Sequence, residues 1–230
     1  MPESEWELRR RWARWGVWSA VLGMVSWVVA VALIPLDAKA ENGDRGIADT
    51  LASTPGRLYL AAMLAVVGGV LLVGFFAVLT RLVPEGEKGW GLLRVSLAGC
   101  VVTQTMVAVG AAFALVGIHS AAGGASPALV AFAWRGLWLT FTASAVPTVL
   151  FTVTGVLGVA DAGLAPQWAC VIGWVSAAAH VVVAFTFAQS GPFAPDGLVA
   201  ALTPVTTVVW ILGTAVGLTR HVQVKAGSGI

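Results

Sequence analysis

Two polar side chains stand inside long apolar segments, and they are the first candidates for chemistry. His180 lies within GWVSAAAHVVVAFTF (173–187), and Gln104 lies within the apolar stretch that begins near residue 92. Ionisable groups inside a membrane segment are costly, so they face other helices or a polar cavity and mark candidate sites. Each is about 12 residues from the same end of its segment, roughly 18 Å at the helical rise. We expect the two at one depth, hydrogen-bonded if their helices are adjacent, as a packing contact or as part of a ligand pocket.

The composition indicates the elements that must position these side chains. Of the 230 residues, 58% are hydrophobic and only 10% are charged, whereas soluble domains carry about 25% charged residues. Apolar runs of about 20 residues cross a bilayer, and a backbone in lipid satisfies its own hydrogen bonds as helix. The sequence therefore predicts an all-α, polytopic transmembrane bundle in a single domain, with an outer loop at 35–55. The six predicted spans are 15–34, 56–79, 92–118, 132–160, 168–188 and 197–218.

Basic residues predict the orientation. With the N-terminus inside, nine Lys and Arg residues fall on cytoplasmic segments and four fall outside, a bias that agrees with the positive-inside rule. Both termini are then cytoplasmic, and the net charge of +2 gives no reason to expect a nucleic-acid partner. The cytoplasmic set is Arg9, Arg10, Arg11, Arg14, Arg81, Lys88, Arg94, Arg220 and Lys225, and the outer set is Lys39, Arg45, Arg57 and Arg135.

The N-terminal segment has a second reading. Its basic start, apolar run and Ala38-Lys39-Ala40 resemble a signal peptide with a cleavage site. The apolar run is longer than the usual 7–15 residues of such a peptide, which favours an uncleaved span. Cleavage would leave five spans.

Tryptophan is abundant, with 11 residues, and supplies further ligand candidates. Most are expected to form belts at the membrane surfaces. Three lie deeper and two flank an outer arginine, and these are candidates to line a cavity. Arg135 between them could hold a lipid phosphate or a carboxylate through its two-pronged guanidinium. The deep residues are Trp27, Trp174 and Trp210, and the flanking pair is Trp134 and Trp138.

The outer face carries the other polar cluster. Its acids are expected either to pair with arginines at helix ends or to join His119 at a metal site, but no spacing requires a metal, and none is predicted. His119 lies about 13 Å above the level of His180, which excludes haem ligation by both, so no cofactor is predicted. Cys100 and Cys170 show no C-x-x-C spacing and are expected to pack as small residues. The outer-face candidates are Asp37, Glu41, Asp44, Asp49, Arg57 and His119.

Three segments of the C-terminal half carry a family resemblance. GLWLTFTASAVPTVLFTVTG, AGLAPQWACVIGWVSAAAH and SGPF…LTPVTTVVWILGTAVGLTR resemble a group of uncharacterised bacterial six-helix membrane proteins. In that group a short Gly/Leu-Pro turn with a Trp precedes the fifth helix. Members commonly carry a basic residue where this chain has Gln167. The resemblance implies a six-helix layout in a bacterial plasma membrane and no activity.

Three classes of function remain open. The first is a non-catalytic protein that binds a lipid-like or other apolar small molecule, or that acts as a partner subunit or homo-oligomer in the bilayer. The second is a membrane-embedded enzyme, such as an isoprenoid cyclase, in which aromatic faces stabilise a cation. The third is a small transporter, which the absence of Asp and Glu from all six predicted spans disfavours. We expect the first.

Overall fold

The computed structural model describes residues 5–35, 42–186, 188 and 191–227, and this part of the chain forms seven α-helices and no strand. Five of the helices are long and apolar enough to cross a bilayer. The all-helical prediction is therefore confirmed, together with five of its candidate spans. The helices are α1 (Glu5–Ala32), α2 (Gly43–Ser53), α3 (Pro55–Leu82), α4 (Trp90–Ala122), α5 (Pro127–Asp161), α6 (Gln167–Val183) and α7 (Leu198–Gly227), and α2 and α6 are the two that fall short of the span length.

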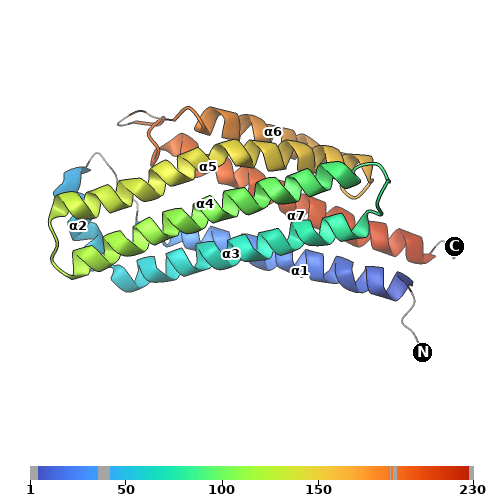
Figure 1. Cartoon of the computed structure of the whole chain (residues 1–230), viewed down its shortest axis with the longest axis horizontal. Helices are drawn as coiled ribbons and strands as arrows, with labels where there is room; N and C mark the ends of the chain where they lie inside the picture. Colours follow the sequence, from blue (N-terminus) through green and yellow to red (C-terminus); the bar gives the residue numbers. More distant parts are fainter. Residues whose placement is uncertain (1–4, 36–41, 187, 189–190, 228–230) are drawn as a thin grey trace.

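The six longer helices form a closed ring. Contacts join α1 to α3, α3 to α4, α4 to α5, α5 to α6, α6 to α7 and α7 back to α1. The helices run lengthwise through an elongated bundle, in which α1 begins and α7 ends at one end and α2 lies at the other (Figure 1). We call these the terminal end and the α2 end. A ring of six helices encloses an interior that its side chains must fill or leave open.

The turns at the terminal end depend on close backbone contact. Gly89 precedes α4 with a φ of +84°, a conformation that L side chains rarely adopt. A Cβ at this position would also meet the carbonyl oxygen of Gly158 on α5. Gly89 therefore lets the start of α4 lie directly against the end of α5.

The prediction of a loop at 35–55 is wrong for its second half, because α2 occupies Gly43–Ser53. Ile47 and Leu51, one turn apart on α2, are fully buried against Leu58, Ile118 and Trp134. An amphipathic helix this short has too little apolar sequence to stand out in a charged segment. Residues 36–41, which include Asp37, Glu41 and the signal-peptide-like Ala38-Lys39-Ala40, lie outside the described residues.

The predicted span 168–188 is wrong at its outer end, because α6 stops at Val183. The backbone N–H and the hydroxyl of Thr186 both donate to the Val183 carbonyl, at 2.9 and 2.7 Å. These bonds form a turn directly after the helix. The 17 residues of α6 span about 26 Å, slightly less than the roughly 30 Å hydrocarbon core. In the part of the bundle that lies past the end of α6, no described helix stands between α5 and α7.

Candidate functional site

Aromatic side chains fill the terminal half of the ring interior. Trp210 is 1% exposed, stacks on Phe151 at a centroid distance of 6.1 Å and meets Phe76 at 6.0 Å. Its indole also lies over Gly173, where a Cβ would come within 2.8 Å of Nε1. These residues form a packed floor beneath the open part of the interior.

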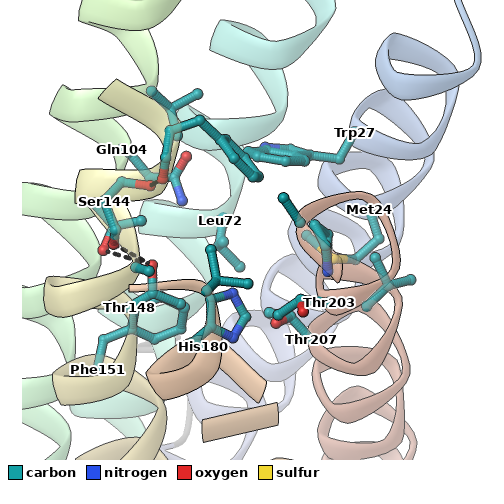
Figure 2. A pocket seen from close by; sticks show the side chains of 18 residues that line it. Met24, Trp27, Leu72, Gln104, Ser144, Thr148, Phe151, His180, Thr203 and Thr207 are labelled. Carbon is teal, nitrogen blue, oxygen red and sulfur yellow. Dashed lines mark hydrogen bonds between the residues drawn. The ribbon is translucent and has the colours of Figure 1, made fainter. Parts of the chain in front are cut away.

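A chamber of about 60 Å³ lies directly above this floor. Its surface is mostly apolar, but seven of its 18 lining residues are polar, and we call it the polar chamber. Side chains from α1, α3, α4, α5, α6 and α7 line it, so every helix of the ring contributes (Figure 2). None of the described residues that line it is Asp, Glu, Lys or Arg. Its polar residues are Thr103, Gln104, Ser144, Thr148, His180, Thr203 and Thr207.

His180 presents one ring nitrogen to this chamber as an acceptor. The side chain is 8% exposed, and its Nδ1 lies 2.8 Å from the backbone carbonyl oxygen of Ser176, one turn earlier on α6. A carbonyl oxygen only accepts, so Nδ1 carries the proton and, in the neutral ring, Nε2 is left with a free lone pair. The backbone of α6 thereby fixes both the orientation and the tautomer of the ring.

Gln104 lines the same chamber from α4, but it is not hydrogen-bonded to His180 in the described structure. The bond was expected only for adjacent helices, and α5 lies between α4 and α6 in the ring. Gln104 Oε1 is buried, has no hydrogen-bond partner among the described atoms, and lies against Gly69 of α3. The amide thus has unused hydrogen-bonding capacity at the chamber wall.

The hydroxyl groups of the chamber are already used as donors. Ser144 donates to the Phe141 carbonyl, Thr148 to the Ser144 carbonyl and Thr203 to the Val199 carbonyl, each at 2.6–2.8 Å. Thr103 lies 3.4 Å from the Thr148 hydroxyl oxygen. Because the Thr148 proton is directed to a carbonyl, Thr103 is the donor of this pair. These four hydroxyls retain only acceptor lone pairs.

A larger apolar chamber lies toward the α2 end and has a volume of about 180 Å³. Trp134 and Trp138 of α5 both line it, as the sequence suggested. The two chambers share Trp27 and Phe141 in their walls, and these rings lie 6.2 Å apart between centroids. Asp196, just before α7, also borders the apolar chamber.

The layers of the interior can be followed along α5. Trp134 and Trp138 line the apolar chamber, and Phe141 contributes to both chambers. Ser144 and Thr148 line the polar chamber, and Phe151 belongs to its floor. Successive turns of one helix therefore pass from an apolar to a polar and back to an aromatic environment.

Two predicted cavity tryptophans lie elsewhere. Trp174 is 46% exposed on the outside of the ring, so its prediction as a cavity residue is wrong. It follows Gly173 directly and is therefore turned about 100° from the inward face of α6. Trp210 is inside the ring, but it packs in the floor and is absent from the walls of both chambers.

The described candidates of the outer face are not among the residues that line the chambers. Arg135 forms an exposed ion pair with Asp44, at 2.6 Å between Nη2 and Oδ1, and the guanidinium of Arg57 donates to the Ala32 carbonyl. Asp49 and His119 are exposed. Within the described ranges, no group of three or more His, Cys, Asp or Glu side chains could hold a metal ion. The pairing of an outer acid with Arg135 agrees with the simpler of the two readings of the sequence.

Several residues that form the chambers carry only a weak signal in the sequence. Ser144 and Thr148 belong to a Ser/Thr stripe at every fourth position of α5, a pattern typical of a helix contact. Thr203, Thr207 and Phe141 had no distinguishing signal at all. Trp27 was distinguished in the sequence only by its deep position in an apolar segment.

No family model, no curated protein and no solved structure matches this chain.

Proposed function

We propose that this chain is a six-span membrane protein that binds a small lipid-like molecule inside its helical ring. The observation that carries the proposal is that two chambers adjoin and share wall residues, one of them apolar and aromatic and the other containing His180, Gln104 and hydroxyls in its wall. An apolar pocket with a few convergent polar groups is the usual form of a small-molecule site. The apolar body of the ligand occupies the larger chamber, and its polar group occupies the smaller one.

Unsatisfied polar atoms support a bound molecule. Six described side-chain atoms are buried without a hydrogen-bond partner, and three of them, Trp27 Nε1, Gln104 Oε1 and Trp138 Nε1, belong to residues that line a chamber. The other three belong to Thr142, Thr152 and Trp210, which line neither chamber. Leaving a buried donor or acceptor unpaired costs about 1–3 kcal/mol. The polar chamber is large enough for a few water molecules, which need roughly 10–15 Å³ each, but apolar cavities stay dry. Water alone therefore leaves the larger chamber empty, whereas an amphipathic molecule fills both.

In this proposal α6 also crosses the bilayer, which brings the number of spans to six, and both termini are cytoplasmic. The basic residues at the start of α1, in the turn before α4 and at the end of α7 gather at the terminal end. The α2 end carries fewer, among them Arg45 and Arg57. This asymmetry has the sign that the positive-inside rule requires.

A membrane-embedded enzyme is the second candidate, and Asp196 is the observation that favours it. This carboxylate borders the apolar chamber, whose walls include Trp27, Trp134 and Trp138. Aromatic faces stabilise cations, and an acid beside them could transfer a proton to an apolar substrate. An enzyme of this kind predicts that Asp196→Asn changes the chemical identity of the bound molecule, whereas a binding protein retains the same molecule.

The proposal is tested by mass spectrometry of an organic extract of protein purified in mild detergent. We expect one molecule in stoichiometric amount with the wild type, at least tenfold less with His180→Leu or Gln104→Leu, and an unchanged amount with Val181→Leu and Val102→Leu. The two control positions are exposed neighbours of the chamber residues on the same helices. Equal extracts of bulk lipid from all five proteins would overturn the proposal.

A further inference from the structure

The polar chamber restricts the polar group of the ligand, an inference that rests on the proposed function. Three properties of its walls bear on this group: charge, hydrogen-bonding sense and size. Together they select one chemical class among lipid-like molecules.

The lack of charged side chains in the polar chamber excludes a ligand whose polar group is ionised. The described walls of both chambers contain no Lys or Arg, so no permanently cationic side chain there neutralises a phosphate or a carboxylate. The polar chamber contains no Asp or Glu either, so an ammonium group also lacks a counter-ion. Burying an unpaired charge costs far more than burying a neutral polar group. The ligand therefore carries an uncharged polar group.

Most of the hydrogen-bonding groups in the chamber walls can only accept, so they require a donor on the ligand. His180 Nε2 accepts, because Nδ1 donates to the Ser176 carbonyl. The hydroxyls of Ser144, Thr148 and Thr203 are directed to backbone carbonyls and can only accept from a ligand. A ketone, ether or ester could accept from Trp27 Nε1 or from the Gln104 amide, but it would leave His180 Nε2 without a donor. A hydroxyl group places a proton there.

Gln104 supplies the complementary contact. A primary amide offers donors whichever way its two ends are placed, and Gln104 makes no hydrogen bond among the described residues. A hydroxyl oxygen that donates to His180 can accept from this amide. One O–H group can therefore serve both side chains, which line the same chamber from α4 and α6.

Size limits both parts of the molecule. The polar chamber, at about 60 Å³, admits a group of a few heavy atoms. The apolar chamber, at about 180 Å³, slightly exceeds a cavity of roughly 150 Å³ that binds benzene. A diacyl lipid is too large for this interior, whereas a branched or cyclic alcohol of moderate size fits.

We infer that the ligand is a neutral alcohol with a compact apolar body, whose hydroxyl group donates to His180 Nε2 and accepts from the Gln104 amide.

The inference is tested with geraniol, a branched alcohol, against its methyl ether and the corresponding geranic acid. Tritiated geraniol is bound to the protein in nanodiscs, with empty nanodiscs as the control for partition into lipid, and the three unlabelled compounds compete. For the wild type we expect the ether and the acid to compete at least tenfold more weakly than the alcohol, since each leaves His180 or a charge unsatisfied. In His180→Leu the alcohol should lose its advantage over the ether, whereas Val181→Leu should retain it.

The outcomes separate this inference from the proposed function. If the ether or the acid competes as well as the alcohol, the hydroxyl assignment is overturned, while the chambers remain a binding site. Failure of geraniol to bind above empty nanodiscs also overturns it, and the organic extract then decides the proposed function independently. The comparison of the three compounds on the wild type does not depend on the folding of any variant.

Discussion

His180 and Gln104 line one chamber from helices on either side of α5, without bonding to each other. His180 uses the backbone carbonyl of Ser176, one turn away on its own helix, and Gln104 rests against Gly69 of the neighbouring helix. A local backbone acceptor is always within reach of a helical side chain, whereas a partner two helices away is not. Both side chains therefore keep capacity for a third group between them.

Gly69 offers a way to change the polar chamber without altering its polar residues. A Cβ at Gly69 would come within 2.6 Å of Gln104 Oε1, which is the far end of a flexible side chain. We expect Gly69→Ala to fold with little change in thermal midpoint, to displace the amide into the chamber and to lower the amount of extracted ligand at least fivefold. Unfolding in detergent and the organic extract measure the two effects.

The matched control is Gly74→Ala on the same helix, where the nearest atom is Ser19 Oγ at 3.7 Å. It should leave both the thermal midpoint and the extract unchanged. A Gly69→Ala protein that retains the full amount of ligand would show that the Gln104 amide does not border the occupied space.

The sequence located these residues by counting along the helices, but it could not give their contacts. Depth follows from the helical rise, so the common level of His180 and Gln104 was predictable. The hydrogen bond was not, because it depends on which helix lies between α4 and α6. The outward position of Trp174 was within reach of the sequence, since it lies one residue from the Gly173–Ala177–His180 stripe of small and polar residues.

At the scale of the elements, α2 covers the end of the ring nearest the apolar chamber. Ile47 and Leu51 are fully buried against Trp134, which is itself part of that chamber wall. The ion pair of Asp44 with Arg135 joins α2 to α5, but its side chains are 42% and 45% exposed. Exposed pairs stabilise by about 0–1 kcal/mol, so apolar contact holds α2 in place.

We therefore expect Ile47→Ala to lower the free energy of unfolding by about 2–5 kcal/mol and Asp44→Asn to lower it by less than about 1 kcal/mol. Chemical unfolding in detergent, followed by circular dichroism, compares the two proteins. A larger loss from Asp44→Asn than from Ile47→Ala would mean that the ion pair, and not the apolar face, docks this helix.

Hydropathy predicted where the long helices lie but missed details set by single residues. It could not detect α2, in which only two apolar side chains are fully buried. It extended α6 to residue 188, because the Thr186 hydrogen bonds to Val183 have no counterpart in a hydropathy average. The apolar chamber at the α2 end is therefore lined by α1, α3, α4, α5 and α7, without α6.

For the whole molecule, the closed ring explains why an interior can remain open. Each of its six helices contacts two neighbours, so side chains from all six bound the polar chamber, and side chains from all but α6 bound the apolar chamber. Pairing of this kind cannot be deduced from apolar segments of similar composition. The sequence therefore predicted five long apolar helices that the structure contains but not the two chambers that their order creates.

Six crossings with cytoplasmic termini predict which loop residues a membrane-impermeant maleimide reaches. In a Cys100→Ala, Cys170→Ala background, single cysteines at Asp49 and Ala188 should be labelled in right-side-out vesicles. Those at Glu87 and Asp161 should be labelled only after permeabilisation. All four positions are exposed, and they lie on α2, after α6, in the turn before α4 and at the end of α5.

The pair Asp161 and Ala188 tests α6 alone, since these residues lie on either side of it. Labelling of both from the same side would mean that α6 does not cross the bilayer. Labelling of Glu87 and Asp161 from outside, with the other two protected, would mean that the orientation is inverted.

The central claim is that the two chambers together hold one molecule, and native mass spectrometry of the intact protein released from mild detergent tests it most directly. The account predicts a single mass excess for the wild type and for Val181→Leu, with one bound molecule per chain, and the bare chain for His180→Leu and Gln104→Leu. A bare chain in all four proteins, or the same mass excess in all four, would contradict it.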